Sequence, residues 1–132
     1  MINLIKKLFE KETILKKDST GKPILDLIPL QKVVVNPETQ EKCDELIRVY
    51  ELGGWTYTGG HMPSKFNFWE GKGKTYLDAE VDYTFKKNGE FGRSEKIFYL
   101  MSNWKIISTN KFYKIQEITP KILKEINKYY DM

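Results

Sequence analysis

The chain has 132 residues, of which 40% are hydrophobic and 30% are charged, a balance typical of a globular protein and not of a disordered one. This length predicts one domain over residues 1–132, with residues 1–30 as a candidate peripheral helix and connector. No apolar run approaches the roughly 18 residues of a membrane span, and the N-terminus lacks the apolar stretch of a signal peptide. We therefore expect a cytoplasmic protein that makes no contact with a membrane.

The net charge is +4, but the chain contains only two arginines, Arg48 and Arg93. A dedicated reader of phosphates or bases usually favours arginine for its forked guanidinium, and the positive charge disfavours an acidic mimic of DNA. A single cysteine, Cys43, excludes an intrachain disulfide, and its place on an apolar helix stripe is typical of a small buried hydrophobe. The single histidine, His61, excludes metal sites built on a histidine pair. We expect no cofactor.

The N-terminal quarter predicts one helix and one extended segment. Apolar residues at helical spacing predict a short amphipathic helix over residues 2–12, and the composition of residues 18–23 predicts a turn. Residues 24–30 are apolar but contain Pro29, so they predict an edge strand or an extended connector.

The next segment has clear start and stop signals for a helix. Residues 31–35 are β-branched and predict a strand, Asn36 is a good N-cap, and Pro37 suits the first helical position. Gly53 and Gly54 predict the helix end, and Trp55 begins a second strand. The pattern indicates a β-α-β unit.

The second half of the chain reads mainly as strands. Residues 76–85 alternate between apolar and polar, and an Asn-Gly turn at residues 88–89 predicts a hairpin that returns over residues 97–100. Two further strands are predicted over residues 104–108 and 112–115, and Thr119 and Pro120 open a final helix. We therefore expect an α+β fold with a mostly antiparallel sheet of about four to six strands packed against two or three helices.

The order Q-K-V-V-V-N, a helix ending E-L-G-G and then W-T-Y-T-G-G resembles a class of small bacteriophage and prophage proteins. These share a helix followed by a glycine–aromatic–x–Trp–x–(Ser/Gly)–Gly strand, whereas here Trp55 comes first and Tyr57 second. A weaker likeness extends to the closing I-T-P-K-I-L helix. Most of these proteins have no assigned chemistry, so the resemblance implies no catalytic residue. It implies a mobile-element protein made in the cytoplasm of a bacterial host.

Two aromatic segments are candidate binding surfaces. Residues 65–74 interleave aromatics with lysines, which suits base stacking beside phosphate contacts, or else a packed strand followed by a solvated turn. The pair Trp55 and Tyr57, with His61 at the rim, suits stacking on a nucleotide or sugar ring, or else packing in the core. The candidate binding residues are Lys65, Phe66, Phe68, Trp69, Lys72, Lys74, Trp55, Tyr57 and His61.

Two further features have both a functional and a structural interpretation. Asp78, Glu80 and Asp82 share one strand face and form a weak candidate site for Mg²⁺ or Mn²⁺, although a half-exposed strand also places carboxylates outward. The apolar stripe of the last helix, which ends at Tyr129 and Tyr130, either forms a homodimer interface or packs on its own sheet.

Small size, abundant aromatics and the resemblance together favour a non-enzymatic accessory or inhibitory protein of phage or mobile-element type. Its expected partner is a host protein or ribonucleoprotein, and anti-defence action, including an anti-CRISPR-like role, follows by analogy alone. The alternatives are a single-stranded nucleic-acid-binding protein, and less strongly a metal-dependent nuclease or a nucleotide-sequestering protein.

Overall fold

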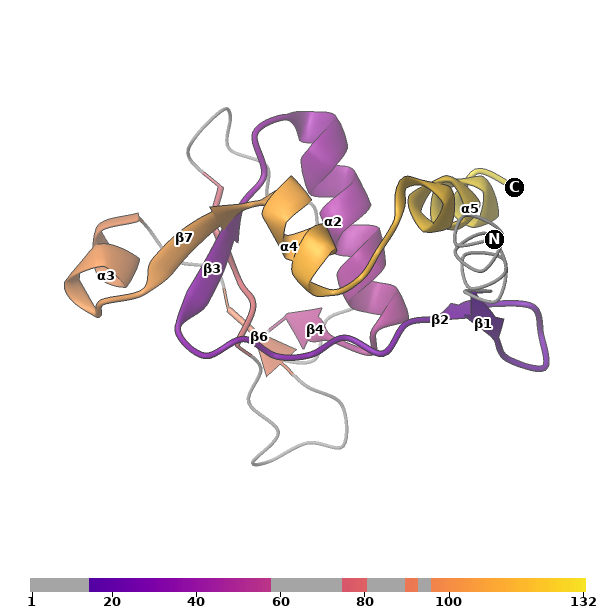
Figure 1. Cartoon of the computed structure of the whole chain (residues 1–132), viewed down its shortest axis with the longest axis horizontal. Coiled ribbons are helices and arrows are strands. Elements are labelled where there is room, and N and C mark those ends of the chain that lie inside the picture. Colours follow the sequence, from indigo (N-terminus) through magenta and orange to yellow (C-terminus); the bar gives the residue numbers. More distant parts are fainter. Residues whose placement is uncertain (1–14, 58–74, 81–89, 93–95) are drawn as a thin grey trace, which may run out of the picture.

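A computed structural model describes residues 15–57, 75–80, 90–92 and 96–132. Figure 1 shows a central pair of strands, β3 and β7, beside the long helix α2, with α5 at one end of the molecule and α3 at the other. The elements, in chain order, are β1 (Lys16–Lys17), β2 (Pro23–Ile24), β3 (Val33–Asn36), α2 (Gln40–Leu52), β4 (Thr56–Tyr57), β5 (Leu77–Asp78), β6 (Glu90–Phe91), α3 (Lys96–Met101), β7 (Lys105–Ser108), α4 (Thr109–Ile115) and α5 (Pro120–Tyr130). The helix predicted over residues 2–12 lies outside the described residues.

The described strands form three small sheets, so the α+β class is confirmed, but the prediction of one mostly antiparallel sheet of four to six strands is wrong. The largest sheet has the order β5-β3-β7, and β1–β2 and β4–β6 form two-stranded sheets. Within the described residues, β3 pairs with β7 and β4 with β6 in parallel, while β1–β2 and β3–β5 are antiparallel. Alternation in a sequence indicates that a strand exists, but neither its partner nor its direction, which explains the error.

The predicted β-α-β order exists along the chain, but its two strands do not pair. β3 and β4 belong to different sheets, and the parallel neighbour of β3 is β7, which lies far along the sequence. The helix also begins later than predicted, because Asn36 is still part of β3, where it pairs with Ser108. Thr39 is the actual N-cap, and its side chain accepts a hydrogen bond from the Lys42 backbone N–H.

Two segments predicted as strands are helices. Residues 96–101 form α3, where a returning hairpin strand was predicted, and residues 109–115 form α4, where a strand over 112–115 was predicted. Short apolar runs rich in aromatic and β-branched residues suit either structure, so tertiary packing decides between them. The strand predicted over 104–108 is confirmed as β7, and Thr119 and Pro120 open α5 as predicted. The described part of the alternating strand buries Leu77 and Ala79, while its continuation over 81–89 lies outside the described residues.

Three helices end in the same hydrogen-bonded motif, which we call the helix-end motif. In each, a tyrosine carbonyl accepts a hydrogen bond from the backbone N–H five residues later, over a residue with positive φ, as in a Schellman turn. Each motif has an accepting tyrosine, a residue with positive φ and an N–H donor, in that order. They are Tyr50, Gly54 and Trp55 after α2; Tyr99, Asn103 and Trp104 after α3; and Tyr113, Glu117 and Ile118 after α4. The φ angles at the central residues are 79°, 62° and 58°.

The central sheet packs on both faces. Val35, Leu77 and Ile107 face the larger core, which lies between the sheet and α2, α4 and α5. There the Tyr50 ring lies 4.8 Å from Trp55, 4.6 Å from Phe91 and 5.6 Å from Phe112, measured between ring centroids. The opposite face carries a smaller cluster, in which Val34 packs with Tyr76 and Tyr99, with Trp104 and Ile106 partly buried beside them.

The segment between β2 and β3 is an extended connector, which is one of the two structures predicted for residues 24–30; the other was an edge strand. Leu25, Leu27 and Leu30 pack against the larger core. The Gln116 side chain holds this connector to the end of α4, because its amide donates to the Ile28 carbonyl and accepts from the Ile28 N–H, both at 2.7 Å. Among the described helices, none combines the length and the apolar character that crossing a membrane would require.

Candidate binding groove

A groove of about 510 Å³ lies between α4 and the start of α5. This volume falls within the range of pockets that hold small ligands or the anchoring side chains of partners. Its walls are mostly apolar, with a few polar groups at the rim. The lining residues are Asn110, Tyr113, Lys114, Glu117, Ile118, Thr119, Pro120 and Leu123.

The helix-end motif after α4 shapes this groove. The backbone N–H of Ile118 returns to the Tyr113 carbonyl at 2.8 Å, which turns the chain sharply after α4. Thr119 then caps α5 by accepting from the Ile122 N–H at 3.2 Å, so α5 begins at once and diverges from α4. Two helices joined by so short a turn leave a hollow between them, with Tyr113 and Ile118 buried at its base.

Glu117 occupies a strained position at the rim of the groove. Its φ of 58° lies in the left-handed region, which costs a residue with a Cβ roughly 1–2 kcal/mol relative to the right-handed conformation. The equivalent positions after α2 and α3 carry glycine and asparagine, the two residues that tolerate this conformation best. Lys32, in the turn before β3, also has a positive φ of 49°, so among the described residues this conformation is not confined to the end of α4. Strained backbone concentrates at functional sites, which makes Glu117 a feature of interest beside the groove.

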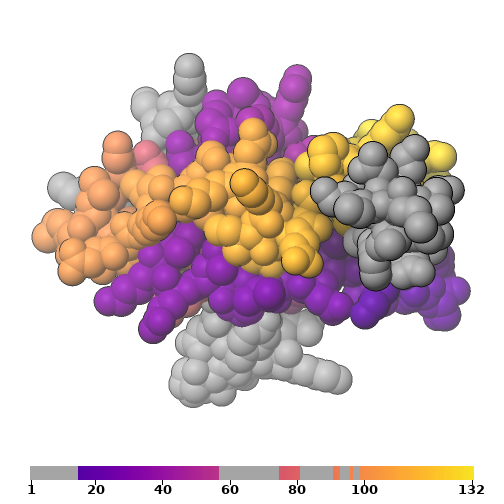
Figure 2. All heavy atoms as spheres, in the orientation of Figure 1, coloured from indigo at the N-terminus to yellow at the C-terminus, as the bar shows by residue number. Residues whose placement is uncertain are grey.

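One lysine lines the groove, and two more lie nearby on the same two helices. Lys114 lines it, Lys111 precedes Lys114 by one helical turn on α4, and Lys124 follows the lining residue Pro120 by one turn on α5. All three are exposed, and Figure 2 shows the orange-to-yellow atoms of α4 and the start of α5 at the surface toward the viewer. The Lys105 side chain lowers the pKa of Lys111 through a hydrogen bond and through charge repulsion. With Lys111 and Lys124 counted beside Lys114, the cations outnumber the single lining carboxylate among the described residues, that of Glu117.

The Tyr113 phenol, at the base of the groove, is neutral and lies beside the Glu45 carboxylate. Burial, reinforced by the Glu45 carboxylate, raises the pKa of the Tyr113 phenol far above its usual value, so the phenol stays neutral. The Glu45 carboxylate also accepts from the Asn127 amide at 2.9 Å, and Asn127 in turn accepts from Arg48 at 3.0 Å. This network ties α5 to α2 and fixes one wall of the groove.

The structure places Trp55 in the core and away from any surface. Its side chain is 1% exposed, because the helix-end motif after α2 draws the ring against Tyr50. Trp55 is therefore unsuited to stacking on a ligand, and the packing interpretation of this residue holds. Of Tyr57 the structure describes only the backbone, in β4. The other candidate binding residues, His61, Lys65, Phe66, Phe68, Trp69, Lys72 and Lys74, lie outside the described residues.

The acidic strand contributes two carboxylates, and both bind backbone amides. Asp78 accepts from the Gly92 N–H at 3.2 Å, and Glu80 accepts from the Lys32 N–H at 2.7 Å. Burial raises the pKa of Asp78 to about 6, with the Tyr99 hydroxyl and the Gly92 amide partly opposing the shift. No group of three metal-ligating side chains occurs in the part of the chain that the structure describes, and Asp82 lies outside it.

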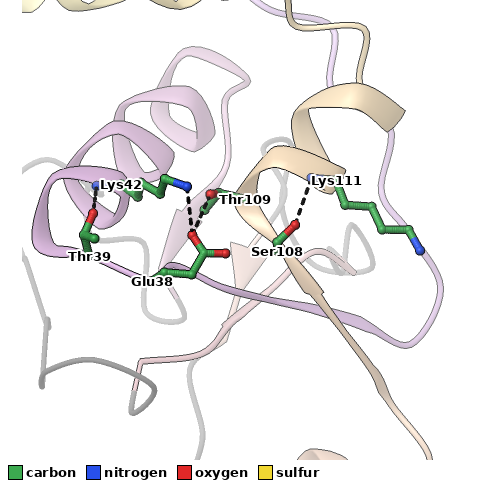
Figure 3. Close-up of polar contacts among 6 residues, drawn as sticks. All are labelled: Glu38, Thr39, Lys42, Ser108, Thr109 and Lys111. Carbon is green, nitrogen blue, oxygen red and sulfur yellow. Dashed lines mark hydrogen bonds and ion pairs between the residues drawn. The ribbon is translucent and has the colours of Figure 1, made fainter.

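A second polar cluster lies where β3 and β7 end side by side (Figure 3). The Glu38 carboxylate lies between the two helix starts, 3.2 Å from the Lys42 ammonium and 3.3 Å from the Thr109 hydroxyl. The Glu38 carboxylate thus links Lys42 of α2 to Thr109 of α4. These contacts join the start of α2 to the start of α4.

The apolar stripe of α5 is used within the chain. Ile122 and Ile126 are buried in the larger core, and Leu123 and Tyr130 pack against it. The Arg48 guanidinium lies 5.2 Å from the centre of the Tyr130 ring. Most of the surface on which the homodimer prediction rested is therefore covered by α2, while Leu123 also lines the groove.

The groove is not predicted by the sequence, because residues 112–115 were expected to form a strand and are part of α4. A signal was present, since Tyr113 and Ile118 repeat the five-residue spacing of Tyr50–Trp55 and Tyr99–Trp104. No protein-family model, curated protein or solved structure matches this chain.

Proposed function

We propose that this protein is a non-enzymatic binding protein that uses the α4–α5 groove to engage another macromolecule and thereby block one of its surfaces. The observation that carries this proposal is the groove itself, an apolar hollow whose rim combines a strained backbone at Glu117 with exposed lysines. Apolar anchors that enter such a hollow, surrounded by charge, are the usual source of affinity in protein interfaces.

The chemistry of the remaining described residues favours binding over catalysis. The Cys43 side chain is fully buried in the core, which suits packing and not nucleophilic attack. Asp78 and Glu80 are each engaged with a backbone amide. The likeness to small phage and prophage proteins supplies the expectation of a host protein or ribonucleoprotein as the partner, and anti-defence machinery is a target class by analogy alone.

Site-specific photo-crosslinking tests this proposal. A benzophenone amino acid would replace Lys114 at the groove, and in a matched control it would replace Lys17, an exposed residue of β1. In a bacterial lysate we expect a discrete adduct from position 114 that position 17 does not give. The adduct's protein, once purified, should bind the wild-type chain and bind the Leu123→Glu variant at least tenfold more weakly. Identical adducts from both positions, or none from position 114, would contradict the proposal.

A further inference from the structure

The charges around the groove indicate what kind of partner fits it. Lys114 lines the hollow, and Lys111 and Lys124 are exposed residues of α4 and α5 that each lie one helical turn from a lining residue. Among the described residues that line it, the carboxylate of Glu117 is the only negative charge. The other acidic residue of α5 within one turn of the groove, Glu125, lies on a different face of the helix, since it is two residues from Leu123.

Resting on the proposed function, we infer that the groove binds an acidic protein segment, with an apolar side chain of the partner in the hollow and carboxylates beside Lys111, Lys114 and Lys124. Charge complementarity of this kind directs the partner to the groove and sets the register of binding, while the apolar anchor supplies affinity. Because Lys111 already lies beside Lys105, a carboxylate there also relieves repulsion between two ammonium groups.

The same lysines fit a nucleic acid less well. A single-stranded binder places exposed aromatic rings where bases can stack on them, and the aromatic ring that lines the groove, Tyr113, is 4% exposed. The cations are lysines, which lack the planar fork that arginine offers to phosphates. The apolar floor, made by Ile118 and Leu123 with the Tyr113 ring, instead suits an aliphatic or aromatic side chain.

Fluorescence anisotropy with defined peptides tests the inference. The probes are labelled peptides in which a central Leu, Phe or Trp is flanked by glutamates, counterparts with glutamine in place of glutamate, and a labelled single-stranded oligonucleotide. We expect at least one glutamate peptide to bind tenfold or more tightly than its glutamine counterpart, and this binding to weaken as salt rises from 50 to 300 mM. Absence of binding by every glutamate peptide would overturn the inference.

Charge-reversal variants localise the site. Lys114→Glu combined with Lys124→Glu should weaken binding of the glutamate peptide by about thirtyfold, or roughly 2 kcal/mol. The matched control, Lys17→Glu combined with Lys22→Glu, changes the net charge equally on the β1–β2 hairpin and should change binding by less than threefold. Equal losses in both variants would show that only the overall charge matters and would overturn the inference.

Glu117 gives a test with the opposite sign. Glu117→Gln removes the carboxylate but keeps the side-chain volume, so the glutamate peptide should bind about threefold more tightly. An oligonucleotide that binds more tightly than every peptide, with the same loss on reversal of Lys114 and Lys124, would assign the groove to nucleic acid and overturn the inference. If the Lys114 adduct forms in lysate but no glutamate peptide binds, the proposed function stands and the acidic partner alone is excluded.

Discussion

The ends of α2 and α4 are built on the same hydrogen bonds but serve different purposes. After α2, Gly54 takes the left-handed conformation and Trp55 enters the core. After α4, Glu117 takes the same conformation, and the turn opens into the groove. One end thus uses the residue that fits without strain, whereas the other holds a charged residue at a cost in stability. The two ends therefore differ in strain, and the strained one lies beside the surface that we propose for binding.

The largest expected effect on stability comes from Trp55, the buried ring that follows α2. Trp55→Ala should lower the free energy of unfolding by about 3–5 kcal/mol, because it removes a fully buried ring that contacts both Tyr50 and Phe112. Urea denaturation followed by circular dichroism measures the change. Ile118→Ala, at the equivalent position after α4, is the matched control and should cost less, since a smaller side chain leaves a smaller cavity. Comparable losses would contradict the distinction between the two ends.

Gly54→Ala isolates the conformational cost of the left-handed position. A Cβ on Gly54 would meet no atom within 4 Å, so steric overlap with neighbours does not contribute. We expect a loss of about 1–2 kcal/mol in the free energy of unfolding from the positive φ alone. Gly53→Ala is a useful contrast, because a Cβ there would overlap the Leu27 side chain. In a Leu27→Ala background the destabilisation by Gly53→Ala should therefore become smaller, whereas the destabilisation by Gly54→Ala should not change. A neutral Gly54→Ala would contradict the strain argument.

The third helix end, after α3, should make stability depend on pH. Tyr99 lies beside Asp78, whose folded pKa of about 6 is above its unfolded value of 3.8. Ionisation of Asp78 therefore opposes folding, so this group adds stability as pH falls through 6 toward 4, by about 1–2 kcal/mol after allowance for its partial exposure.

Urea denaturation of Asp78→Asn at pH 7.5 and pH 5 measures this effect. The variant should lose most of the gain that the wild-type chain shows between the two pH values. Asp26→Asn serves as the control, because Asp26 is exposed and makes only a surface ion pair with Lys16 at 3.4 Å. A pH dependence that Asp78→Asn leaves unchanged would assign the effect to another group.

The smallest effect has the opposite sign to the others. Glu117→Gly should stabilise the protein by about 1 kcal/mol, because glycine adopts the left-handed conformation without strain. Thermal unfolding should show a rise in Tm of a few degrees. Glu125→Gly, in the middle of α5, should instead destabilise by about 1 kcal/mol. A Glu117→Gly variant that is less stable than wild type would mean that the side chain makes a contact worth more than the strain.

Local signals in the sequence determined where α2 ends and where α5 begins. Gly53 and Gly54 stop α2, and Thr119 with Pro120 starts α5, because caps depend on hydrogen bonds and φ values within a few residues. The alternation also identified Leu77 and Ala79 as buried, but the face that it predicted to be exposed carries Tyr76, which is buried in the smaller cluster. Asn36 failed as a cap only because its strand continues one residue further to pair with Ser108.

Tertiary structure alone decided how these elements are arranged. Residues 96–101 and 109–115 carry β-favouring side chains, yet they are helical, and in each helix the tyrosine of the helix-end motif is buried. The parallel pairing of β3 with β7 joins segments about seventy residues apart, which no local pattern specifies. The groove likewise depends on tertiary structure, since it exists only where α4 is a helix and α5 packs on α2. Helix caps depend on contacts between residues that are close in sequence and can be predicted from it, whereas a binding surface depends on packing between residues that are far apart in sequence.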